Sequence, residues 1–139
     1  MVLALPACGD DMDPEGARSL WGRLTAEGFR SWDRAPGYET SRPSRAAHGD
    51  EVIVYVNDVV ADALDAETRL DGWPVGSIVA KDGITDGEVC LVAAMEKRDD
   101  GWFWAEWDPE GDSIYSGAPD LCTGCHRIGD DWVRAFYLP

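Results

Sequence analysis

The stretch from Glu88 to Trp107, which reads EVCLVAAMEKRDDGWFWAEW, decides the fold that we expect for this chain. Residues Glu88–Lys97 predict one strand, and the aromatic run Trp102–Trp107 predicts the next. The intervening Asp99–Gly101 ends in an Asp-Gly pair, which favours a tight hairpin turn. We therefore expect these two strands to pair as an antiparallel hairpin.

Side chains alternate between the two faces of a strand, so the second strand of the hairpin presents two different sets of residues. One face carries Trp102, Trp104 and Glu106, and the other carries Phe103, Ala105 and Trp107. Upstream, the β-branched content of Glu51–Val56 and Ser77–Lys81 predicts two more strands. The second of these is expected to end at Asp82-Gly83.

Two helices are expected upstream of the hairpin. Asp13 suits an N-cap and Pro14 the first helical position. Apolar residues then recur at the spacing of one helix face, at Ala17, Leu20, Trp21 and Leu24. Gly28 weakens the end of this helix, and a second short turn is expected around Phe29 and Trp32. Asn57 can cap a further helix that runs through Leu64.

The remaining segments predict little regular structure. Residues 33–50 indicate a loop or an irregular edge, 108–112 a turn, and Asp131–Leu138 a short helical or extended tail. The sum is an α+β fold with an N-terminal helix, a mostly antiparallel sheet and a distinct C-terminal segment. We expect a single domain over residues 13–139.

The chain has 139 residues and a formal net charge of −15 at pH 7, which fits one acidic domain. Such a charge repels phosphate backbones and anionic lipid, so nucleic acid is not expected as a partner. Solubility is the simplest reason for the charge, although a basic redox partner would also suit it.

Residues 1–12 are expected to lie outside the domain. Val2–Gly9 is a short apolar run that resembles the end of a bacterial lipoprotein signal, in which Cys8 would become lipid-modified. The residues after it would form a polar tether, and the protein would be periplasmic or bound to the cell envelope. The alternative is an apolar start with an incidental cysteine.

The segment Cys122–His126, with the sequence CTGCH, is a C-x-x-C-H motif, which is typical of c-type haem attachment. Two thiols separated by two residues reach the two vinyl groups on one side of a porphyrin. The next residue, His126, then turns its imidazole under the iron. The imidazole nitrogen that does not bind iron needs a hydrogen-bond acceptor, which the sequence does not identify.

Three other uses of these cysteines stay open. A zinc site would need Cys90 in addition to Cys122, Cys125 and His126, yet Cys90 lies in an apolar strand and is expected to be a buried small hydrophobe. A thioredoxin-like redox pair would need the motif to open a helix within a βαβ unit. A structural disulfide is the third alternative, in an oxidising compartment.

No residue is selected by spacing as a sixth ligand of the iron. The candidates are His48, Met12, Met95, Lys81 and Lys97. We therefore expect an open, five-coordinate iron, which favours ligand binding or catalysis over simple electron transfer.

Several segments, taken in order, resemble the cytochrome P-460 and cytochrome c′-beta family of small haem proteins. The resemblance covers most of residues 28–139, and only the C-x-x-C-H motif in it is highly specific. The segments are Gly28–Trp32, His48-Gly49, Val54–Asn57, Gly76–Lys81, Trp102–Trp107 and, behind the motif, Asp131–Val133. The resemblance implies a β-rich fold and a homodimer in which the sheet covers one haem c per subunit.

The P-460 branch oxidises hydroxylamine to nitrogen oxides, so the resemblance implies a hydroxylamine oxidoreductase, or a protein that handles nitric oxide, with an open iron. In that branch a lysine is cross-linked to the porphyrin, and its position implies Lys81. The alternative is an ordinary lysine at a strand end that faces water. A distal acid or base helps to move protons, and its position implies Glu110 or Asp112, although both also suit a solvated turn.

Two other functions stay open. The c′-beta branch binds nitric oxide or carbon monoxide without catalysis, under a cap of mainly phenylalanine side chains. This chain offers only Phe29, Phe103 and Phe136 for such a cap. A simple electron carrier is the other alternative, and it would require a sixth protein ligand on the iron.

Overall fold

A seven-stranded antiparallel sheet forms the centre of the computed structural model, which describes residues 10–44 and 48–139. The strand order is β1-β3-β4-β5-β6-β7, and β2 also pairs with β3. The strands are β1 Asp33–Arg34, β2 Arg42–Pro43, β3 Glu51–Val56, β4 Ile78–Thr85, β5 Glu88–Arg98, β6 Gly101–Trp107 and β7 Ser113–Gly117. The α+β class and the mostly antiparallel sheet are therefore confirmed, as is the β5–β6 hairpin with its turn at Asp99-Asp100.

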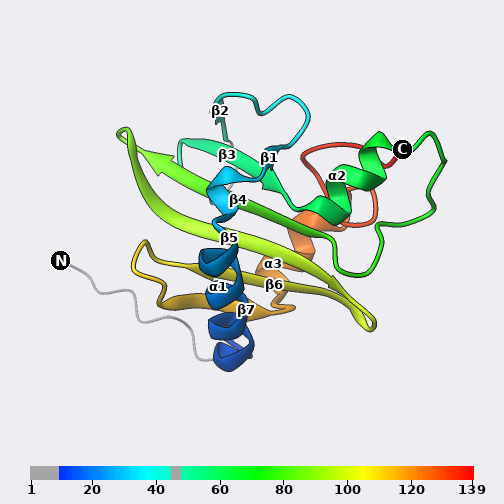
Figure 1. The fold of residues 1–139 in the computed structure, drawn as a ribbon. Helices are drawn as coiled ribbons and strands as arrows, with labels where there is room; N and C mark the ends of the chain where they lie inside the picture. The colour runs from blue at the N-terminus through cyan, green and yellow to red at the C-terminus, as the bar shows by residue number, and fades with distance from the viewer. Residues whose placement is uncertain (1–9, 45–47) are drawn as a thin grey trace.

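One face of the sheet is covered by α1 (Pro14–Glu27), which lies across the front of the sheet in Figure 1. The Asp13 side chain accepts a hydrogen bond from the N–H of Gly16, as expected of an N-cap. Gly28 ends the helix with φ of 61°, a left-handed conformation that favours glycine. A short 3₁₀ helix, η1 (Phe29–Ser31), follows directly.

The alternation predicted for β6 separates two cores. Phe103, Ala105 and Trp107 pack with the apolar side of α1, whereas Trp102 and Trp104 pack on the opposite face. That opposite face carries α2 (Asp58–Asp65), which Asn57 caps. It also carries α3 (Asp120–His126), which lies behind the sheet in Figure 1.

Strand β4 does not end at Asp82-Gly83, which corrects the sequence expectation. Asp82 is buried, but its carboxylate accepts two hydrogen bonds from Arg30 and one from the Tyr55 hydroxyl. These bonds offset the cost of burying the charge, so the strand continues through Asp82. A Cβ at Gly83 would lie 1.9 Å from the His48 carbonyl oxygen, so a larger residue would collide with that loop.

Strand β7 was not expected from the sequence. Its partner on the outer side is the segment before α1, because the N–H of Met12 donates to the carbonyl of Ser116. Asp11 also forms an isolated parallel bridge with Ser116. Part of the segment expected to be a tether is therefore paired with the sheet. The expected lipoprotein signal, with Cys8, lies outside the described residues.

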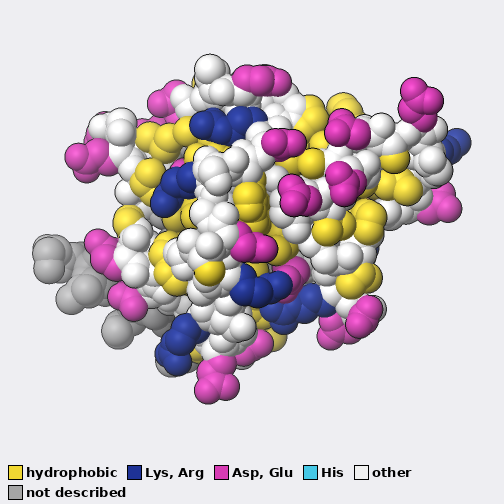
Figure 2. Space-filling model, viewed as in Figure 1, with side chains coloured by type: hydrophobic (Ala, Val, Ile, Leu, Met, Phe, Trp, Pro, Cys, Tyr) yellow, Lys and Arg dark blue, Asp and Glu magenta, His cyan; other side chains and the backbone are white. Residues whose placement is uncertain are grey.

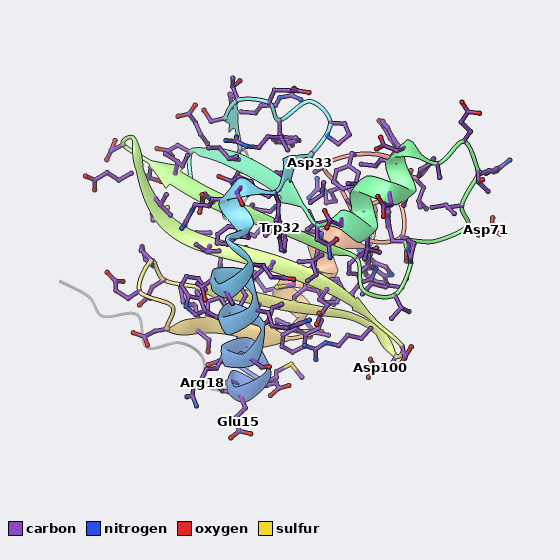
Figure 3. The ribbon with its side chains drawn as sticks, viewed as in Figure 1. Glu15, Arg18, Trp32, Asp33, Asp71 and Asp100 are labelled. Atoms are coloured by element: carbon purple, nitrogen blue, oxygen red, sulfur yellow. The ribbon has the colours of Figure 1, made fainter. Side chains whose placement is uncertain are left out.

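The outer surface is acidic. Figure 2 shows aspartate and glutamate side chains scattered over the face that α1 covers, with no histidine among them. Glu15 and Arg18, at the start of α1, and Asp100, at the tip of the β5–β6 hairpin, are all exposed (Figure 3). None of the helices in the described part of the chain is long and apolar enough to cross a membrane.

Replacing Arg30 with alanine should lower the free energy of unfolding by about 2 kcal/mol. The change leaves the Asp82 carboxylate, which is 3% exposed, without its charged partner. Unpaired buried charges typically cost about 3–5 kcal/mol, and the loss is smaller here because half of the Arg30 side chain already contacts water. Urea unfolding of Arg30→Ala and of the exposed Arg18→Ala measures the effect. Arg18→Ala should change stability by less than about 0.5 kcal/mol, and equal losses in both would contradict this account.

Candidate functional site

A row of five side chains crosses the face of the sheet opposite α1. Successive strand pairings align Val54 with Lys81, Lys81 with Ala93, Ala93 with Glu106, and Glu106 with Tyr115. Residues opposite each other in an antiparallel sheet point to the same face. The small Ala93 therefore separates the lysine from the glutamate and leaves space above the sheet between them.

This row forms the floor of a cavity of about 420 Å³, a size within the range of small-molecule and cofactor sites. The next row of the same face adds Val79, Met95 and Trp104. The opposite wall comes from α3 and the segment after it. The residues that line this wall are Leu121, Cys122, Cys125, His126, Val133, Arg134 and Ala135. The segment before β3, which includes β2, contributes Tyr38, Pro43, Ser44 and His48.

The C-x-x-C-H motif forms most of α3, a short helix that follows Pro119. Asp120 lies in its first turn, where a negative charge favours the helix. One helical turn brings Cys122, Cys125 and His126 to the same cavity wall. The motif and Lys81 lie far apart in the sequence, but both line this cavity.

The acceptor that the sequence did not identify for His126 is the carbonyl of Trp132. His126 Nδ1 lies 2.9 Å from this oxygen, and a carbonyl can only accept, so Nδ1 carries the proton and Nε2 keeps its lone pair. Burial lowers the pKa of His126 to about 4, so the imidazole is neutral at pH 7. A neutral imidazole with one nitrogen held and the other free is the form that binds metals.

His48 and Glu106 form a polar pair inside the cavity. His48 Nδ1 lies 3.4 Å from Glu106 Oε1, and the rings of His48 and His126 have centroids 6.5 Å apart. The sequence suggested an exposed His48 in a loop, but the side chain is largely buried, and this burial lowers its pKa.

Glu106 was not selected from the sequence as a site residue, although a signal was present. It shares a strand face with Trp102 and Trp104, and it is 8% exposed. A carboxylate on an otherwise aromatic, buried face must be paired or functional.

Lys81 lines the cavity and is partly buried. Burial lowers its pKa to about 8, whereas the charge of Glu106 opposes this change. A lysine with such a pKa has an appreciable neutral fraction at pH 7, and the neutral amine is the nucleophilic form. Lys81 thus lies within β4 rather than at a strand end, and it lines the cavity.

Glu110 and Asp112 do not belong to this site, which corrects the expectation that either is the distal acid or base. Both are exposed in the β6–β7 turn, where Asp108 accepts hydrogen bonds from their backbone N–H groups. Gly111 between them packs against Trp21 of α1, on the other side of the sheet. They form the solvated turn that was the alternative interpretation.

The zinc alternative is not supported by the structure. Cys90 is exposed, contrary to expectation, and its thiol lies 3.3 Å from the Gly83 carbonyl, outside the cavity lining. No group of three or more potential metal-binding side chains occurs within residues 10–44 and 48–139.

The redox alternatives are also not supported. Cys122 and Cys125 are not joined in a disulfide. Burial raises the pKa of Cys122 to about 11, whereas a reactive redox pair needs a lowered thiol pKa.

Of the expected sixth-ligand candidates, His48, Lys81 and Met95 line the cavity. Met12 is 60% exposed beside β7, and Lys97 pairs with Asp131.

The three phenylalanines considered for an apolar cap, Phe29, Phe103 and Phe136, do not line the cavity. The first two pack on the α1 face, and Phe136 contacts Trp73.

The chain matches no known family model, and no curated protein or solved structure is significantly similar to it. The resemblance to the cytochrome P-460 and c′-beta family is thus untested by these comparisons and stays a prediction.

Proposed function

We propose that this chain is a c-type monohaem protein of the cytochrome P-460 type, with haem attached at Cys122 and Cys125 and iron bound by His126. The observation that carries the proposal is the placement of the C-x-x-C-H helix against a cavity of about 420 Å³, where His126 Nε2 has no hydrogen-bond partner among the described residues. Two thiols and a neutral imidazole on one wall are the donor set that haem c requires.

The residues present fit such a group. The cavity walls are mainly apolar, as cofactor sites are, and their apolar members include Val52, Val54, Val79, Met95 and Val133. Trp104 also lines the cavity. When bound, haem would supply an iron that takes a small ligand and accepts electrons from it.

The reaction that this site supports best is oxidation of hydroxylamine. Conversion of hydroxylamine to nitric oxide removes three electrons and three protons. The electrons would leave to a redox partner protein, and the protons need a group inside the cavity that accepts them. Glu106, hydrogen-bonded to His48, is the candidate for this role in place of Glu110 and Asp112.

A non-catalytic gas-binding function of the c′-beta kind has less support. Its pocket needs an apolar cap of phenylalanine side chains over the iron, and all three phenylalanines of this chain lie outside the cavity lining. The cavity instead carries the ionisable side chains of Lys81, Glu106 and His48. Polar groups of this kind suit a reaction that moves protons better than passive binding of a neutral gas.

The visible spectrum tests the proposal. The protein is produced in cells that mature c-type haem, and its ferric and ferrous spectra are recorded with and without carbon monoxide. A haem spectrum with rapid binding of carbon monoxide supports an open iron. A colourless protein would refute haem attachment, and a ferrous protein that does not bind carbon monoxide would favour a simple electron carrier with a sixth ligand such as Met95 or His48.

Lys81 is proposed as the residue cross-linked to the porphyrin. Lys81→Met should convert a broad, red-shifted absorption band into the sharp spectrum of ordinary haem c, because methionine fills similar space without an amine. Lys97→Met removes the other lysine of the chain and should keep the wild-type band. A spectrum that Lys81→Met leaves unchanged would exclude the cross-link.

Three further parts of the proposal come from the resemblance and the N-terminal sequence. They are a homodimer, a redox partner protein, and a periplasmic or envelope location with an anchor at Cys8. The acidic charge of −15 suits a basic redox partner, whose binding would weaken at high salt.

A further inference from the structure

Two consecutive residues close to His126 have a left-handed backbone. The φ angles of Asp131 and Trp132 are 46° and 71°, a conformation that is costly for residues with a side chain and persists only where surrounding contacts impose it. Trp132 is also the residue whose carbonyl accepts the hydrogen bond from His126 Nδ1. The strained backbone therefore presents the acceptor that orients the imidazole.

The carboxylate of Asp131 holds this turn in place. Its Oδ2 accepts hydrogen bonds from the backbone N–H of Trp73 at 2.8 Å and from Lys97 Nζ at 2.6 Å. Its Oδ1 lies 3.4 Å from Trp102 Nε1. Because Lys97 and Trp102 belong to β5 and β6, the sheet itself anchors the carboxylate. The Asp131 and Lys97 side chains are only 16% and 20% exposed, so their charged hydrogen bond is stronger than one at the surface.

The backbone on either side of the turn is also fixed. Asp130 and Val133 exchange both backbone hydrogen bonds, at 2.9 and 3.2 Å, and Trp73 Nε1 donates to the Asp130 carbonyl at 3.2 Å. A Cβ at Gly129 would lie 2.4 Å from the Val133 oxygen, so only glycine allows this approach. The backbone before and after the turn is thus fixed, which fixes the position of the Trp132 carbonyl between them.

From this geometry we infer that Asp131 and Lys97 are positioning residues that set the hydrogen bond of His126 and thereby the electron-donating strength of its Nε2. A firm Nδ1–H···O=C bond fixes the tautomer and raises the basicity of the ligating nitrogen. A more basic imidazole stabilises ferric iron more than ferrous iron, so the pair lowers the reduction potential. This inference rests on the proposed haem at His126.

The test compares wild type with Asp131→Ala, Asp131→Asn and Lys97→Met, each as the full chain with haem attached. Resonance Raman spectra give the iron–histidine stretching frequency of the ferrous protein, and a redox titration gives the potential. Asp131→Ala should lower the frequency and favour the ferrous form about tenfold, which is about 59 mV for a one-electron couple. Asp131→Asn and Lys97→Met should cause smaller changes in the same direction, because Trp73 can still donate to residue 131.

Asp82→Asn is the matched control, because it disrupts a buried aspartate–arginine pair on the other face of the sheet. It should lower stability and leave frequency and potential unchanged, which separates positioning from a general loosening of the fold. The inference is overturned if Lys97→Met and Asp131→Asn keep wild-type values, or if Asp82→Asn shifts them equally. These variants decide the question even if Asp131→Ala does not fold. A wild-type protein without haem would refute the proposed function, and this inference with it.

Discussion

Changing both Cys122 and Cys125 to alanine should leave the protein without covalently bound haem, whereas Cys90→Ala should carry as much haem as the wild type. The first two thiols lie on the cavity wall beside His126, and Cys90 lies outside the cavity lining. Each thioether bond needs its own thiol, so the double variant loses every covalent attachment. The expected loss is complete and does not depend on the proposed redox reaction.

Intact-protein mass spectrometry after denaturation measures this outcome, because only covalent haem survives unfolding. The wild type and Cys90→Ala should retain the mass of one haem, and the double variant should show the mass of the bare chain. Haem that survives in the double variant, or is lost from Cys90→Ala, would contradict the assignment. The single variants Cys122→Ala and Cys125→Ala should each retain at most one thioether.

Changing Glu106 to glutamine should reduce hydroxylamine turnover at least about 100-fold, within the range that proton transfer by a positioned side chain contributes. Glutamine keeps the size of the side chain and can still hydrogen-bond to His48, but it cannot accept a proton at pH 7. The ferric and ferrous spectra should stay close to wild type, because haem attachment does not involve Glu106. Turnover is measured with an artificial electron acceptor.

Glu110→Gln is the matched control for Glu106→Gln. Glu110 lies four residues further along the chain, but it is exposed in the β6–β7 turn and does not line the cavity. Its change should leave turnover within about twofold of wild type. A large loss for Glu110→Gln together with full activity of Glu106→Gln would restore the role that the sequence suggested for this turn.

The hairpin at the centre of the fold could be predicted because its signals are local. Alternation in β6 and the Asp-Gly turn are properties of neighbouring residues, and both are confirmed. The helix caps at Asp13 and Asn57 are confirmed for the same reason.

The extent of β4 and the existence of β7 could not be predicted, because each depends on a distant partner. Asp82 continues its strand only because Arg30, 52 residues earlier, neutralises it. Ser116 belongs to a strand whose outer partner is Met12. Such non-local pairing overrides the local tendency of Asp and Gly to end a strand.

The candidate site divides in the same way. The C-x-x-C-H motif is contiguous and could be recognised directly, and Lys81, which the resemblance singled out, lines the same cavity. Glu106 and the Trp132 carbonyl could not be selected, since their roles arise from the pairing of β4, β5 and β6 and from a turn held by Asp131. Glu110 and Asp112 were chosen by distance along the chain, which says little about distance in space.

The two-sided character of β6 also constrains how the protein folds. A slip of one residue between β5 and β6 would turn Glu106 toward α1 and move Trp107 to the cavity side, since a single-residue shift exchanges the faces of a strand. The slipped chain would then bury an unpaired carboxylate against Leu20 and Leu24, at a cost comparable with the whole stability of a small domain. Molecules with the slipped register would therefore unfold rather than accumulate. Every molecule that stays folded would accordingly have the same side chains lining its cavity.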